Sequence, residues 1–231
     1  MGDAGAVGYA DPALVRTWVT GWTVSRGTPA PTRLPWGLYM DVGSARIVGR
    51  HVLLRADEEA VREATAGVTV PETWIMVFAE PDEVAAWLPH GWQVDHGETG
   101  HLMTADLTLA GPGTGHGRAV GGPDALPDGY ARTVETRDGV TLVRIDDAAG
   151  EPAARGQMAV RDGAAVMDRI STEEAHRRRG LGSVVMRTLA DRAVAAGATL
   201  GLLGATPQGR ALYETLGWRV RSVLTECVYR P

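Results

Sequence analysis

The chain has 231 residues, of which 44% are hydrophobic and 22% are charged, so it is long enough to bury one large core or two small ones. Its formal net charge of -5 and its pI near 5.7 exclude the basic surface of a dedicated nucleic-acid-binding protein. The single cysteine, Cys227, excludes a disulfide framework and a paired-cysteine metal site within the chain. No apolar run approaches the roughly 18 residues of a membrane helix, and the first residues do not resemble a signal peptide, so we expect a cytoplasmic protein.

The first half of the chain, residues 1–110, has the periodicity of alternating helices and strands. Its apolar residues recur at three- and four-residue spacing in the helical segments and in short continuous runs in the strands. In chain order, the pattern predicts a helix capped by Asp11, two strands (GLYMDV and RIVGRHVLL), a helix over 57–66, a buried strand over 73–79, a short helix over 81–88 and a hairpin of WQVDH with HLMTADLTL.

Residues 111–129 are rich in glycine and proline and have almost no large apolar side chain, which is typical of a linker. The second half, residues 130–231, begins with strands joined by short glycine-containing turns, which indicates an antiparallel meander. In chain order, it predicts the strands YARTVET, VTLVRID, ARGQMAV and AAVMDRIS, a helix over 180–196, the buried strand TLGLL, a helix over 209–216, and WRVRSVLTECVYR as one bent strand or a hairpin.

The two halves resemble each other. A shift of 126 residues aligns AAWLPHGWQV (85–94) with ALYETLGWRV (211–220) and superposes Trp92 on Trp218. The order of helix, buried strand, short helix and terminal strand is also shared. We interpret this as an internal duplication; chance similarity in an Ala- and Gly-rich chain is the alternative.

A basic, glycine-containing loop lies between a predicted strand and a predicted helix, with the sequence Arg-Arg-Arg-Gly-Leu-Gly-Ser over 177–183. Gly180 and Gly182 allow the backbone to approach a ligand closely, and the free N–H groups of the helix start favour an anion. The loop therefore predicts a pyrophosphate site. The alternative is an ordinary solvated helix start.

A second motif, Ala-Leu-Tyr-Glu-Thr-Leu-Gly-Trp over 211–218, follows one helix and one buried strand later. Together, R-x-x-G-x-G and L-Y-x-x-L-G-W resemble the GNAT N-acetyltransferase superfamily over roughly residues 130–231. The resemblance implies an α+β fold with a mixed, mostly antiparallel sheet flanked by helices, and acetyl-CoA as co-substrate without a metal. By its repeat, the first half is expected to be a degenerate GNAT-like half-domain.

The resemblance also implies which residues bind the cofactor. The main chain of the strand end before the loop falls where family members hold the acetyl and pantetheine groups, and the loop itself falls on their pyrophosphate site. Thr206 stands where the family often has asparagine, and it can still cap the following helix. The implied cofactor residues are Ile170, Ser171, Thr172, Arg177, Arg178, Arg179, Gly180, Leu181, Gly182, Ser183 and Thr206.

Two residues are candidates for proton transfer. Tyr213 falls on the usual general acid of the family, and the alternative is a core tyrosine that packs a helix on the sheet. Asp168 shares a strand face with apolar neighbours, where its pKa could rise, so it is a candidate base. An ion pair with an arginine is the alternative for Asp168, and other acids, Glu135, Glu173 and Glu174, are rivals.

The second half departs from the family upstream of the loop. A full family domain has two helices after its first strand that build a wall of the acceptor pocket, whereas residues 130–171 contain only strand patterns. We expect the first half to provide this wall. Core packing is the favoured interpretation of its tryptophans, and lining of the acceptor pocket by Trp18, Trp22 and Trp36 is the alternative. The first half has Trp87 in place of Tyr213 and no basic loop, so we interpret it as non-catalytic.

The expected function is transfer of an acetyl group from acetyl-CoA to the primary amine of a small molecule. The alternatives are a protein N-terminus or lysine as acceptor, or a non-catalytic acyl-CoA-binding module. We expect no nucleic-acid or membrane partner. The oligomeric state, including a homodimer, is left open.

Overall fold

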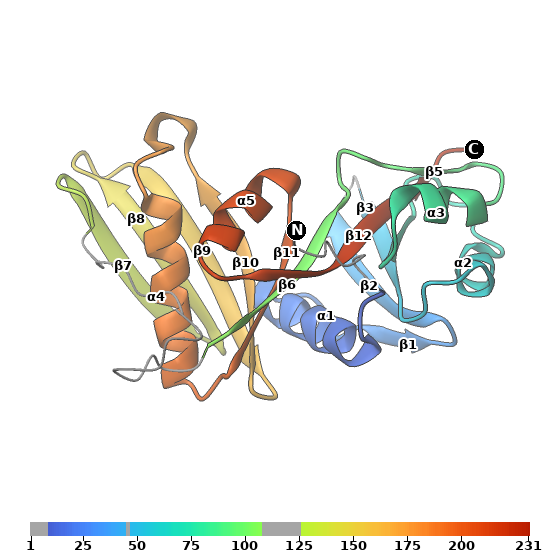
Figure 1. The fold of residues 1–231 in the computed structure, drawn as a ribbon, viewed down its shortest axis with the longest axis horizontal. Coiled ribbons are helices and arrows are strands. Elements are labelled where there is room, and N and C mark those ends of the chain that lie inside the picture. Colours follow the sequence, from blue (N-terminus) through green and yellow to red (C-terminus); the bar gives the residue numbers. More distant parts are fainter. Residues whose placement is uncertain (1–8, 45–46, 108–125) are drawn as a thin grey trace, which may run out of the picture.

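The computed structural model describes residues 9–44, 47–107 and 126–231, and the predicted linker lies mostly outside these residues. The described residues form one sheet of 12 strands in the order β1-β2-β3-β4-β12-β6-β11-β10-β9-β8-β7, with β5 paired to β12 (Figure 1). Its pairs are antiparallel except β3 with β4 and β10 with β11. The expected α+β class with a mixed, mostly antiparallel sheet is confirmed.

The elements have the following bounds. The helices are α1 (Pro12–Arg26), α2 (Glu58–Thr65), α3 (Pro81–Trp87), the 3-10 turn η1 (Glu174–His176), α4 (Leu181–Ala195) and α5 (Pro207–Thr215). The strands are β1 (Thr32–Leu34), β2 (Gly37–Ser44), β3 (Ile47–Leu53), β4 (Trp74–Val77), β5 (Trp92–Val94), β6 (Gly100–Asp106), β7 (Tyr130–Arg137), β8 (Val140–Asp147), β9 (Pro152–Arg161), β10 (Ala164–Thr172), β11 (Leu200–Ala205) and β12 (Arg219–Tyr229).

The predicted helices form within a few residues of their expected bounds because their caps act as the sequence indicates. The carboxylate of Asp11 accepts a hydrogen bond from the amide of Ala13 at 2.8 Å, and Gly27 ends α1 in the left-handed conformation. The hydroxyl of Thr206 likewise accepts from the amide of Gly209 at 3.1 Å and starts α5. These caps place the ends of the helices that border the site.

The predicted hairpin between β5 and β6 is wrong. Strand β5 pairs with the end of β12, from Cys227 to Tyr229, whereas β6 lies between β11 and the start of β12. The two strands are close in sequence, but each finds its partner in the C-terminal part of the chain. Local sequence separation therefore gave the wrong pairing.

The two halves have exchanged their last strands. Strand β6 precedes the linker yet completes the sheet of the second half, and residues Thr225–Val228 of β12 pair with β4 in the first half. The repeat shift of 126 residues carries β5 onto the start of β12 and β6 onto its end, so the exchange is reciprocal. In Figure 1, β6 in green and β12 in red run between the two ends of the molecule.

Helix α1 belongs to the first half by sequence but covers the sheet of the second half. It packs on β9 and β10, on the face opposite α4, because Val166 contacts α1 and its neighbours Ala165 and Met167 face α4. A Cβ atom at Gly21 would overlap the Val166 side chain, so glycine permits this close approach. The helix thus lies on the strands that carry the site.

Three hydrophobic clusters stabilise the fold. One lies between the second-half sheet and α4 with α5, one lies under α1, and one lies between the first-half sheet and α2 with α3. Trp36 packs against the third cluster. None of the described helices is long and apolar enough to cross a membrane.

Candidate functional site

A groove of about 710 Å³ runs between the loop 177–183 and helix α5. Its lining contains almost all of the residues that the sequence assigned to the cofactor, together with four others from α5. The lining residues are Ile170, Ser171, Thr172, Arg177, Arg178, Gly180, Leu181, Gly182, Ser183, Thr206, Gln208, Gly209, Leu212 and Tyr213. The structure therefore brings together two motifs that are separated in sequence by α4 and β11.

The backbone of the loop is shaped to start a helix directly at the groove. Gly180 is the N-cap of α4 with φ +79°, a conformation that favours glycine, and it leaves the first turn of the helix without a side-chain cap. Arg177 donates from Nε to the carbonyl of Thr172 at 3.4 Å and so ties the loop to the end of β10. The open N–H groups and the two groove-lining arginines suit an anionic ligand.

Arg179 is the one candidate cofactor residue that the structure does not bring to the groove. Its guanidinium donates to the hydroxyl of Tyr130 at 3.0 Å, and this hydroxyl also lies 2.9 Å from Nδ1 of His176. The described lining of the groove omits Arg179. Its position ties the loop to the start of β7, which is a structural role.

Strands β10 and β11 separate at the end of the groove. Their parallel pairing ends at Val166 and Leu202, and β10 then bulges between Asp168 and Ser171. Main-chain groups on both strands beyond this point are released from the ladder, which leaves them free for a ligand that enters between the strands. The separated segment of β10 includes Ile170, one of the candidate main-chain contacts.

A second cavity of about 300 Å³, the central pocket, lies on the α1 side of this separation. Its walls come from both halves of the chain: α1, β3 and β4 on one side, and β10, β11 and α5 on the other. The lining residues are Trp18, Trp22, Arg26, Arg50, Met76, Glu98, Gly100, Met167, Asp168, Arg169, Ile170, Leu203, Gly204, Ala205, Thr206, Gly209, Tyr213, Leu224 and Glu226. The pocket and the groove share Ile170, Thr206, Gly209 and Tyr213.

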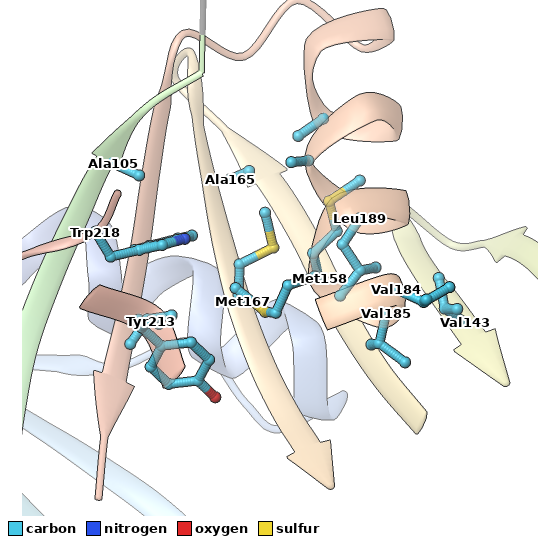
Figure 2. Packing of buried hydrophobic residues seen from close by; sticks show 14 of the residues in the cluster. Ala105, Val143, Met158, Ala165, Met167, Val184, Val185, Leu189, Tyr213 and Trp218 are labelled. Atoms are coloured by element: carbon cyan, nitrogen blue, oxygen red, sulfur yellow. The ribbon is translucent and has the colours of Figure 1, made fainter. Parts of the chain in front are cut away.

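Tyr213 stands where the two cavities meet. Its ring is 7% exposed and packs beside Trp218, with 6.2 Å between the ring centroids. In Figure 2 the hydroxyl oxygen points away from the side chain of Trp218, at the edge of the cluster. Burial, with a smaller contribution from the charge of Asp168, raises the pKa of Tyr213 to about 12. The phenol therefore keeps its proton at neutral pH and can donate it.

Asp168 lies in the central pocket but its carboxylate is fully engaged. Arg26 of α1 donates from Nε at 2.8 Å and from Nη2 at 2.7 Å, and Ser25 donates from its hydroxyl at 3.3 Å. Arg26 also stacks over the ring of Trp22, 4.1 Å from its centroid. The pair fixes α1 on β10 and so forms the wall that the second half lacks.

Known proteins resemble this chain in sequence and in fold. Residues 118–218 match the model of the acetyltransferase (GNAT) family. This match, which covers less than half of the chain, identifies residues 118–218 as a GNAT domain.

Solved structures of GNAT proteins share the fold of the whole chain. A GCN5-related N-acetyltransferase from Kribbella flavida has a TM-score of 0.62 and 16% identity, with 96% of each chain covered. A GNAT-family structure from Novosphingobium aromaticivorans has a TM-score of 0.58 and 18% identity, with 96% of this chain and 100% of the other covered. A tandem GNAT protein from the clavulanic acid biosynthesis pathway has a TM-score of 0.55 and 14% identity over 84% and 73%. No curated protein matches the sequence significantly.

The similarity to the tandem neighbour covers 84% of this chain, so it extends into the fold of the first half. Residues 130–171 form strands alone, as expected, and α1 of the first half covers a face of the second-half sheet. Of the three tryptophans proposed to line the pocket, Trp18 and Trp22 do so, whereas Trp36 packs elsewhere.

Among the charged residues of the central pocket that sequence reasoning missed are Glu226 on β12 and Arg50 on β3. Glu226 lies inside an otherwise apolar strand, in the segment Thr-Glu-Cys-Val, and a carboxylate at such a position was the signal that could have found it. Among the described residues, no group of three His, Cys, Asp or Glu side chains could hold a metal ion.

Proposed function

We propose that the chain is an N-acetyltransferase that moves the acetyl group of acetyl-CoA to the primary amine of a small molecule. The observation that carries this proposal is the meeting of the groove and the central pocket at Tyr213. One cavity suits a nucleotide-like anion, the other suits a compact acceptor, and a proton donor stands between them. This arrangement fits a transfer between two bound substrates.

The groove fits coenzyme A in chemistry and size. The glycine-capped start of α4, with Arg177 and Arg178 beside it, suits a pyrophosphate, and Ser183 offers a hydroxyl donor. The separated end of β10 offers main-chain groups near Ile170 to the pantetheine arm. Acetyl-CoA brings the thioester, which is the activated acyl group of the reaction.

The reaction joins the amine nitrogen to the acetyl carbon, breaks the carbon–sulfur bond, releases the amine proton to water and returns a proton to the thiolate. Tyr213 suits the last step because its phenol is protonated and stands at the junction of the cavities. Main-chain donors released where β10 and β11 separate suit the developing oxyanion. Asp168, which was the candidate base, is held by Arg26 and serves in this proposal to position α1.

A small acceptor is favoured over a protein because α1 covers the central pocket. The helix is fixed by the Asp168–Arg26 pair and by Gln157, whose side-chain amide donates to the carbonyl of Ser25 at 2.6 Å. A volume of about 300 Å³ is at the low end of small-molecule sites. A protein segment would require this wall to move.

The test combines binding and turnover. Calorimetric titration with acetyl-CoA is expected to show one site per chain, and a panel of primary amines is expected to stimulate release of free thiol from acetyl-CoA. Mass spectrometry then checks that the responding amine gains one acetyl group. Binding of acetyl-CoA without amine-stimulated release for any member of the panel contradicts catalysis and favours an acyl-CoA-binding module.

A further inference from the structure

A buried ion pair of Glu226 and Arg50 lies at the end of the central pocket that is next to the strands of the first half. Glu226 is 3% exposed, and its Oε1 atom is 3.4 Å from Nη2 of Arg50. Within the described part of the chain, Oε2 of Glu226 and Nε of Arg50 have no hydrogen-bond partner. Buried polar atoms normally have hydrogen-bond partners. These two atoms without partners, at one end of a cavity, therefore point to a polar ligand.

The surroundings of Glu226 favour a cation. Arg50 from β3 supplies one positive charge, while Glu98 and Asp95 approach from the segment between β5 and β6. Asp95 shares the guanidinium of Arg230, 3.8 Å away, with Glu72, which lies closer to it at 2.8 Å. When Glu226 is ionised, its negative charge and those of Glu98 and Asp95 outnumber the positive charge of Arg50. Trp18, Met76 and Leu224 provide apolar walls beside them.

Burial raises the pKa of Glu226 to about 7, against the opposing effect of Arg50. An adjacent cation would lower this pKa again and relieve the cost of the buried charge. The carboxyl is thus ionised and unsatisfied in slightly alkaline solution, and a bound ammonium group satisfies it.

The position of Glu226 separates it from the reacting centre. The thioester is proposed to lie where β10 and β11 part, and β12 is separated from β11 by β6. Glu226 lies two residues beyond Leu224, where the pairing of β12 with β6 ends, and pairs instead with Met76 of β4. The two places are therefore separated both across the sheet and along β12, by more than the roughly 10 Å of two strand spacings. The side chain of Glu226 and an alkyl chain of the acceptor together span this distance.

We propose that Glu226 binds a second ammonium group of the acceptor, so that the preferred acceptor is a short aliphatic diamine. One nitrogen reacts beside Tyr213, and the other contacts the carboxylate that the exchanged strand β12 brings to the pocket. A flexible alkyl chain joins the two nitrogens. The inference rests on the proposed acetyl transfer and adds the chemical class of its acceptor.

The test compares three acceptors of matched length that differ only at the far end: 1,4-diaminobutane, n-butylamine and 4-aminobutyrate. Rates are measured with saturating acetyl-CoA at about pH 8, where Glu226 is ionised. We expect kcat/KM for 1,4-diaminobutane to exceed that for n-butylamine by about tenfold or more, as for a charge-assisted hydrogen bond. We expect 4-aminobutyrate to be the poorest of the three.

The variant Glu226→Gln keeps the shape of the side chain and removes its charge. It is expected to lower kcat/KM for 1,4-diaminobutane by about tenfold while n-butylamine changes by less than about twofold. The matched control is Glu59→Gln on α2, whose side chain is 71% exposed and far from the pocket lining. The control is expected to preserve the preference for the diamine.

Three results overturn the inference. Equal use of 1,4-diaminobutane and n-butylamine by the unaltered protein removes the second ammonium site, whether or not the variant folds. Preference for 4-aminobutyrate assigns the site to Arg50 and an anionic acceptor. An unchanged diamine preference in Glu226→Gln removes Glu226. In all three cases acetyl transfer to an amine still occurs, whereas its absence with every amine refutes the proposed function as well.

Discussion

The substitution Glu226→Gln makes a prediction about stability that does not depend on any substrate. Glu226 is 3% exposed, and burial is the main cause that raises its pKa from 4.5 to about 7. Between these two values the folded protein binds more protons at this site than the unfolded chain does. The free energy of unfolding therefore falls as the pH rises through this window, and the cost is complete above about pH 7.

The size of the effect follows from the two pKa values. Their difference is about 2.5 units, and at about 1.36 kcal/mol per unit it corresponds to about 3 kcal/mol. Glutamine carries no titrating proton. The free energy of unfolding of Glu226→Gln therefore does not fall in this pH window because of this site. The variant also leaves Arg50 without its charged partner, but arginine stays protonated throughout, so that cost does not vary with pH.

Urea denaturation at about pH 4, 5.5, 7 and 8 measures the difference between the variant and the unaltered protein. We expect this difference to move in favour of the variant by about 3 kcal/mol from the lowest to the highest pH. The exposed control Glu59→Gln should follow the unaltered protein at each pH. A difference that stays constant with pH would show that the carboxyl group is solvated, and the reasoning about its burial would fail.

Three further predictions concern Tyr213 at the meeting point of the two cavities, Gly182 in the groove, and the dependence of the second half on the first. Tyr213→Phe should lower kcat by roughly a hundredfold with little change in acetyl-CoA affinity, whereas a purely packing role would leave kcat intact and cost about 1 kcal/mol of stability in a melting curve. Gly182→Leu should abolish calorimetric binding of acetyl-CoA, because even a Cβ there is 3.2 Å from Leu212 and a larger side chain must enter the groove; unaltered affinity would contradict the site. A chain that starts at Pro123 should be insoluble or inactive, because it lacks β6 and α1, and a soluble, active product would show that the second half is independent.

The sequence predicted the local structure and the groove well because both depend on short-range signals. The caps at Asp11 and Thr206, the glycine at 180 and the periodicity of the helices act within a few residues. The loop follows β10 and the segment around Tyr213 follows β11, and these two strands are neighbours in the sheet. A correct prediction of the strands and helices therefore also places the two motifs side by side.

The pairing of distant strands could not be predicted in the same way. Strands β5 and β6 had the spacing of a hairpin, and no local signal shows that each would pair with the C-terminal strand instead. The contact of Arg26 with Asp168 and that of Arg50 with Glu226 depend on this long-range arrangement. Apart from Asp168, the charged residues of the central pocket were therefore the part of the site that only the structure reveals.

The exchange of β6 and β12 also sets the order in which the molecule can be completed during synthesis. Strand β4 of the first half pairs with β12, which follows every other strand in the sequence, so the first half cannot finish its sheet as its own residues leave the ribosome. A tandem of independent domains would fold from the N-terminus onward. Here the contacts with the greatest sequence separation form last, and folding is expected to be slow, with one edge of β4 and one edge of β6 left unpaired until β12 arrives.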